Sequence, residues 1–239
     1  MRTLKSKTII NTMRLYVKHC PEACPERRAI LEEHLADRGF TDVKWITKYP
    51  VDHPFIQWLH KRLGQHLSPE CISGLVKNLE ACQDLADDPT LDGAMFCDDD
   101  AVFIKDWADK IVIPAGIPFV NMSIGVNFHL LPTGGLRHIQ NNGGCEVIWM
   151  SKQFAQMVVN NTDGRSGIDH VYFGLIRHIG ADLVCSPIAQ QTSLLQPRKG
   201  SLPNISKYQP DDPWHVFVNK FKPTGLVYSD LWYESGIVR

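Results

Sequence analysis

Three consecutive aspartates, Asp98, Asp99 and Asp100, carry the clearest chemical signal in this sequence. They follow an apolar run over 93–97 that is typical of a buried strand, and apolar residues resume after them. Adjacent carboxylates repel one another and resist removal from water. A divalent cation removes that cost, because hard cations prefer oxygen ligands such as carboxylates. Strand alternation would turn Asp98 and Asp100 to one side and Asp99 to the other.

A structural explanation of the triplet is also open at this point. Aspartate is common in surface turns and as the N-cap of a helix, and a helix could begin near residues 105–107. The metal-site explanation requires the aspartates to lie at the ligand-binding edge of a sheet. The elements that position the triplet therefore decide between the two.

The length and composition indicate an ordinary globular protein with one large domain, or with one domain and a sizeable extension. The 239 residues are 44% hydrophobic and 21% charged, and the net charge of −1 gives no reason to expect a nucleic acid partner. The seven cysteines match no zinc-binding spacing and are expected to be reduced thiols of a cytoplasmic protein. We find no secretory signal and no apolar stretch of about 18 residues, so no transmembrane helix is expected. The oligomeric state stays open.

The first half of the chain alternates strands with helices. Residues 14–19 and 43–46 have the composition of strands, and a helix begins between them at Pro25, with an apolar stripe over 29–35. This β-α-β order predicts a parallel sheet covered by helices.

A second helical region leads to the aspartates. A short helix is expected within 53–66, and a longer one begins after Ser68, a good N-cap residue followed by Pro69. The strand over 93–97 follows, and the triplet lies at the carboxyl end of that strand, where open α/β sheets usually bind ligands.

The second half contains fewer clear signals. A glycine-rich loop over 131–144 separates two expected strands, and from residue 190 onward the composition changes to an aromatic, loop-rich tail. Strands are expected at 118–129, 145–150 and 182–188, and helices at 151–160 and 166–178.

Five short segments occur in a particular order: Pro25-Glu26-Arg27-Arg28, Cys71-Ile72-Ser73-Gly74-Leu75, the aspartate triplet, the stretch from Gly144 to Ser151-Lys152, and Gly167-Ile168-Asp169-His170. Together, over residues 14–190, they resemble glycosyltransferase family 25, the lipooligosaccharide and collagen galactosyltransferase type, and more broadly the GT-A glycosyltransferases with a DxD motif. Family members carry a Ser-His pair where this chain has Ser73-Gly74.

The resemblance implies a GT-A (Rossmann-like) fold: a mixed, mostly parallel sheet flanked by helices, with a loop-rich C-terminal tail. It implies one domain over 1–239, with a nucleotide-binding half at 1–110, an acceptor-side half at 111–190 and a tail at 191–239 packed on the domain. The implied activity is metal-dependent transfer of a sugar from a nucleotide-diphosphate sugar to a hydroxyl of a glycan or glycoconjugate, with inversion.

The resemblance also implies roles for individual residues. Asp98 and Asp100 would bind Mn²⁺ or Mg²⁺ and, through the metal, the diphosphate of the donor. Asp99 would accept hydrogen bonds from the ribose or sugar hydroxyls. His19 would border the nucleotide, and Arg27 would meet a phosphate or the base.

The general base implied by the resemblance is Asp169, which would take the proton of the acceptor hydroxyl. Its structural alternative is a helix-start carboxylate after Ser166. Glu146, after the glycine-rich loop, is a competing base, and its alternative is an outward-facing strand residue.

Three histidines are weaker candidates: His215 as a third metal contact, and His129 and His138 as contacts to the acceptor or the diphosphate. Two other functions stay open, a metal-dependent phosphoesterase or nuclease and a non-catalytic carbohydrate- or nucleotide-binding module with a structural Ca²⁺.

Overall fold

The computed structural model describes residues 13–23, 25–63, 67–103, 107–123, 137–138, 145–164, 166–182 and 184–191. Its helices are α2 (Pro25–Asp37), α3 (Pro54–Arg62), α4 (Pro69–Asp87), α5 (Trp107–Lys110), α6 (Lys152–Asn161) and α7 (Ile168–His178). Its strands are β1 (Leu15–Lys18), β2 (Val43–Ile46), β3 (Gly93–Asp98), β4 (Ala101–Phe103), β5 (Phe119–Ser123), β6 (Arg137–His138), β7 (Val147–Ser151) and β8 (Val184–Gln191).

All eight of these strands belong to one mixed sheet. Seven follow the order β2-β1-β3-β7-β5-β8-β4, and β6 pairs with β8. β1 is parallel to both β2 and β3, and β5 is parallel to β8, whereas β7 runs antiparallel between β3 and β5. β4 and β6 are antiparallel to β8. The expected α/β fold with a mixed sheet flanked by helices is confirmed. Its parallel core is β2-β1-β3, whereas four of the seven pairs among these strands are antiparallel.

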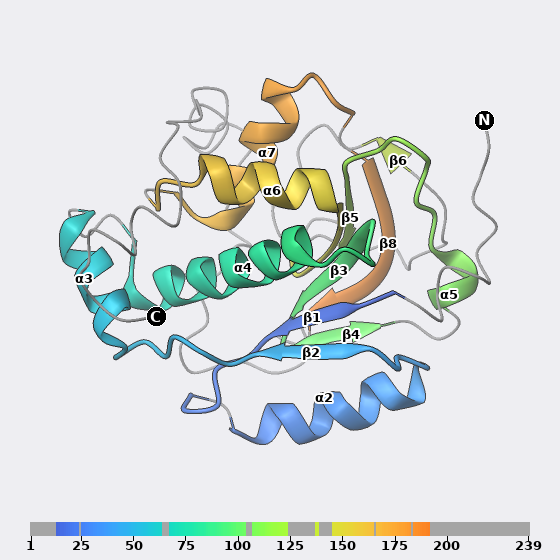
Figure 1. The fold of residues 1–239 in the computed structure, drawn as a ribbon. Coiled ribbons are helices and arrows are strands. Elements are labelled where there is room, and N and C mark those ends of the chain that lie inside the picture. The colour runs from blue at the N-terminus through green and yellow to red at the C-terminus, as the bar shows by residue number, and fades with distance from the viewer. Residues whose placement is uncertain are drawn as a thin grey trace, which may run out of the picture.

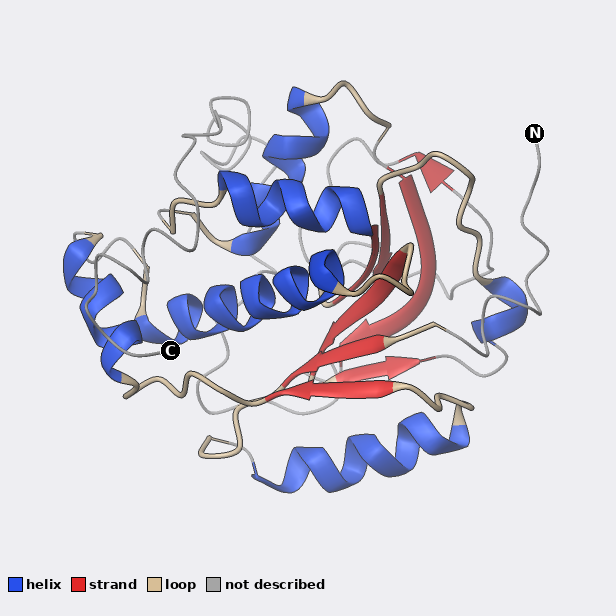
Figure 2. Ribbon diagram, viewed as in Figure 1, coloured by secondary structure: helices blue, strands red, loops and turns tan. Residues whose placement is uncertain are grey.

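Helices cover both faces of the sheet, with α2 on one face and α4, α6 and α7 on the other (Figures 1 and 2). The side chains of β1 alternate accordingly: Tyr16 joins the core under α4, while Leu15 and Val17 join the core that includes Leu31 and Leu35 of α2. The same alternation in β3 gives each face its own apolar core.

The α4 helix starts where the sequence predicts. The hydroxyl of Ser68 accepts from the backbone N–H of Cys71, and Pro69 occupies the first turn. α4 packs against β1, α3 and α6, so even polar side chains in its first half, Ser73, Lys77 and Asn78, are buried.

The apolar stripe expected over 29–35 is only partly correct. Leu31 and Leu35 are buried, but Ala29 and Ile30 are exposed, because α2 packs through a narrow face. No helix among the described residues has both the length and the apolar character needed to cross a bilayer.

Gly93 is required by the close approach of β3 and β7. A Cβ at this position would lie 2.4 Å from Cζ2 of Trp149 and 2.8 Å from the carbonyl oxygen of Met150. We therefore expect Gly93→Ala to lower the free energy of unfolding by about 1–3 kcal/mol, measured by urea denaturation. Gly74→Ala is the matched control, because its Cβ would meet nothing within 4 Å inside helix α4. That substitution should stabilise by about 0.5–1 kcal/mol, and equal losses from both would contradict the packing argument.

Candidate active site

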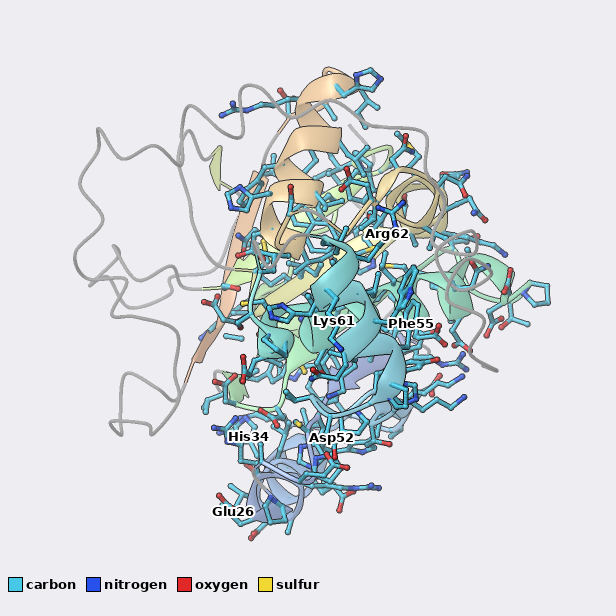
Figure 3. All side chains as sticks on the ribbon, turned by 90° about the vertical axis from the view of Figure 1, so that its left-hand side faces the viewer. Glu26, His34, Asp52, Phe55, Lys61 and Arg62 are labelled. Carbon is cyan, nitrogen blue, oxygen red and sulfur yellow. The ribbon has the colours of Figure 1, made fainter. Side chains whose placement is uncertain are left out.

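The carboxyl ends of the three adjacent parallel strands meet at one edge of the sheet. β1, β2 and β3 end at Lys18, Ile46 and Asp98, and the chain leaves β1 and β2 on the side where α3 lies (Figure 1). Figure 3 looks from this side and shows α3, with Phe55, Lys61 and Arg62 labelled, above α2, with Glu26 and His34 labelled. The aspartate triplet therefore lies at the edge that the metal-site explanation requires.

Asp98 is held in place by a lysine that our sequence analysis did not single out. Lys18 is its direct register partner on β1, and the two side chains form an ion pair at 2.7 Å between Nζ and Oδ1. Burial lowers the pKa of Lys18, but Asp98 and, more weakly, Asp169 raise it above the ordinary value. Asp98 itself is 40% exposed, so its carboxylate is accessible to a ligand. The ion pair of Lys18 and Asp98 follows from the register of β1 and β3, which the sequence alone does not show.

Asp99 is brought together with His19 and Arg27, the two residues expected to border a nucleotide. Its Oδ2 lies 2.8 Å from Nδ1 of His19, and its Oδ1 accepts from a guanidinium N–H of Arg27 at 2.7 Å. Asp99 is 9% exposed and His19 2%. Because both oxygens are engaged, Asp99 ties the end of β1 and the start of α2 to the triplet.

The triplet does not continue the alternation of β3. The strand ends at Asp98, and Asp99 and Asp100 form a turn, so strand geometry no longer determines which way they face. The short strand β4 follows the turn, which separates the triplet from the next helix, α5. The alternative of a helix N-cap is therefore wrong. Asp99 and Asp100 do form a turn, but it is not the surface turn of that alternative, because both residues are buried. Asp100 is 5% exposed.

A buried lysine on α4, Lys77, adds a third cationic side chain near the triplet, after Lys18 and Arg27. Lys77 is 3% exposed, and its Nζ donates to the hydroxyl of Ser73 at 3.2 Å. Ser73 in turn donates to the carbonyl oxygen of Tyr49 at 2.6 Å. Burial lowers the pKa of Lys77, against the opposing effect of Cys20, Glu22 and Asp99.

Sequence reasoning missed this lysine because it assigned α4 a single apolar face. Tyr49, in the loop after β2, has a φ of 68°, a backbone conformation that is uncommon for a residue other than glycine. The hydrogen bond from Ser73 anchors that backbone, and such conformations cluster at functional sites.

Asp169 and Glu146, the two candidate bases, lie in the same neighbourhood. Asp169 stands in the first turn of α7, whose N-cap is Gly167 without a side-chain cap. Its charge raises the pKa values of Glu146, Cys145 and Lys18, so the carboxylate lies near the carboxyl end of β1 and the start of β7. Glu146 is 7% exposed and not the outward-facing strand residue of the structural alternative.

Burial raises the pKa of Glu146 to about 7, and the nearby Asp169 and Asp98 act in the same direction. Between the ordinary value of 4.5 and pH 7, the folded protein holds a proton that the unfolded chain has lost. Stability therefore falls as the pH rises through this window, by an amount on the order of 3 kcal/mol. Glu146→Gln should flatten the curve of unfolding free energy between pH 5 and 8. If the unfolding free energy of the variant fell as steeply with pH as that of the wild type, the pH dependence would arise from another titratable group.

Several expected contacts lie outside the described residues, among them His129, His215, most of the glycine-rich loop and the tail over 192–239. The backbone of His138 belongs to β6. Among the described residues, no group of three His, Cys, Asp or Glu side chains is arranged to hold a metal ion.

The fold and site define an α/β protein with a cluster of charged side chains where its parallel strands end. No family model matches the chain, and no curated protein matches it. One similar solved structure is a glycosyltransferase involved in the glycosylation of the major capsid of PBCV-1, with 12% sequence identity and a TM-score of 0.34. The alignment covers 61% of this chain and 64% of that one, so this chain spans less than two thirds of its length. The functional assignment therefore rests on the residues of the site.

Proposed function

We propose that this protein is a metal-dependent glycosyltransferase that moves a sugar from a nucleotide-diphosphate sugar to a hydroxyl of a glycan or glycoconjugate. One observation carries the proposal. The aspartate triplet, His19, Arg27 and Asp169 come from distant parts of the chain and gather near the carboxyl ends of parallel strands. Open α/β sheets bind nucleotides at this kind of edge.

The donor set near Asp98 suits a hard divalent cation. Asp98 and Asp100 would supply two carboxylate ligands, and Mg²⁺ or Mn²⁺ of this kind commonly takes its remaining ligands from water and substrate phosphates. Such a site needs no third protein ligand, which agrees with the absence of a three-residue cluster in the described part of the chain. When bound, the metal would offset the charge of the departing nucleoside diphosphate.

The remaining side chains suit the other parts of the reaction. Asp99 keeps His19 and Arg27 at the end of β1, where they would border the nucleotide. Asp169 would accept the proton of the attacking hydroxyl at its carboxylate, which requires the ionised form. Lys18, whose raised pKa keeps its charge, favours that form through its proximity to Asp169. Attack by a positioned hydroxyl opposite the leaving diphosphate would invert the anomeric centre.

Thermal denaturation with a panel of nucleoside diphosphates tests the proposal. A ligand that binds only the folded state raises its stability by mass action, by about 2.7 kcal/mol at a concentration of 100 Kd. We expect at least one nucleoside diphosphate to raise the Tm when Mn²⁺ is present, and to do so less with EDTA. If no nucleotide raises the Tm with or without Mn²⁺, the glycosyltransferase proposal is wrong.

A further inference from the structure

The carboxyl group of Glu146 is buried with one oxygen unsatisfied. Glu146 is 7% exposed, and its Oε2 has no hydrogen-bond partner among the described residues. A buried polar atom without a partner costs about 1–3 kcal/mol, so native proteins rarely keep one. A buried, unpaired oxygen beside the candidate active site indicates that a group of a bound ligand forms a hydrogen bond with it.

The charges around Glu146 restrict what that ligand group is. The backbone N–H of Asp98 donates to the carbonyl oxygen of Glu146 at 3.0 Å, and the carboxylates of Asp98 and Asp169 both act on its carboxyl group. These negative charges would repel a phosphate or a carboxylate. A hydroxyl group fits this environment, because it is uncharged and both donates and accepts hydrogen bonds, so it can pair with either protonation state of Glu146.

We infer that Oε2 of Glu146 binds a hydroxyl group of the sugar that is transferred. The inference rests on the proposed function, in which the sugar ring lies between the diphosphate at Asp98 and the base at Asp169. Glu146 interacts with both of these residues, so it would face the ring. His19, Arg27 and Asp99, which interact with one another, would face the nucleotide.

This contact would make Glu146 a specificity-determining residue. A site built to hydrogen-bond a hydroxyl discriminates strongly against an analogue that lacks it, because the buried polar group is then left unpaired. We therefore expect the enzyme to select a donor sugar with a hydroxyl at the position that Glu146 contacts, and to disfavour the corresponding deoxy sugar.

Titration calorimetry separates a sugar contact from a nucleotide contact. The titrants, all with Mn²⁺, are UDP and GDP, and UDP-glucose, UDP-galactose, UDP-N-acetylglucosamine and GDP-mannose. We compare the nucleoside diphosphate and the matching nucleotide sugar that the wild type binds. Glu146→Ala should keep the Kd of the nucleoside diphosphate within about 2-fold of the wild type, while the Kd of the nucleotide sugar should rise roughly 10- to 100-fold. Glu146→Gln, which keeps an oxygen acceptor, should lose less affinity for the nucleotide sugar than Glu146→Ala. Glu33→Ala removes an exposed carboxylate on α2 and should match the wild type.

Each other outcome overturns the inference. If both Glu146 variants bind the nucleotide sugar as the wild type does, Glu146 contacts no sugar, although the proposed function stands. If the variants lose affinity for the nucleoside diphosphate and for the nucleotide sugar equally, Glu146 contributes to nucleotide binding or to folding and not to a sugar contact. If the wild type binds neither ligand, the proposed function fails and the inference with it. Should Glu146→Ala not fold, Glu146→Gln supports the same comparison.

Discussion

Asp100→Ala should abolish metal-dependent nucleotide binding. Among the described residues, the proposed metal has two protein ligands, Asp98 and Asp100, so the loss of one leaves a single carboxylate there. Changes outside the ligand shell already cost about 10- to 100-fold in metal affinity, and removal of a ligand should cost more. We expect the Kd of the nucleoside diphosphate to rise by roughly 100-fold or more in Mn²⁺, measured by titration calorimetry.

Two further variants make this result interpretable. Asp100 is buried, so Asp100→Asn preserves its shape and should show nearly the same loss without a large change in Tm. Asp109→Ala removes an exposed aspartate on α5 and should bind as the wild type does. If Asp100→Ala retained full Mn²⁺-dependent binding, the triplet would have no role in holding the metal.

Asp169→Asn should separate binding from transfer. The amide cannot take a proton, so the rate of transfer should fall by about 10²- to 10⁴-fold, the usual contribution of a general base. The nucleoside diphosphate should bind within about 2-fold of the wild type, because His19, Arg27 and the triplet are untouched. The measurement is the release of nucleoside diphosphate from the nucleotide sugar that the wild type cleaves, beside calorimetric binding.

A comparison with Glu146 distinguishes the two candidate bases. Glu146→Gln should act mainly on the affinity for the nucleotide sugar, whereas Asp169→Asn should act on the rate at saturation. If Asp169→Asn retained the wild-type rate and Glu146→Gln lost it with donor binding intact, the general base would be Glu146 instead.

The local elements of this protein follow closely from its sequence. Proline at the first turn and Ser68 as N-cap predict the starts of α2 and α4, because these signals act over a few residues. The alternation of strands and helices in the first half predicts the parallel pairing of β1 and β2. The aspartate triplet and its place at the end of β3 also follow from the sequence alone.

The tertiary structure alone determines which side chains meet. Asp99 lies 80 residues from His19 and 72 from Arg27, and Lys18 lies opposite Asp98 only because β1 and β3 pair in one particular register. Burial is likewise a result of packing. β1, α3 and α6 pack against α4, which buries Lys77, and Glu146, just before β7, is buried as well. The sequence determines the candidate metal ligands, whereas the packing of distant segments surrounds them with the charges that give each carboxylate its role.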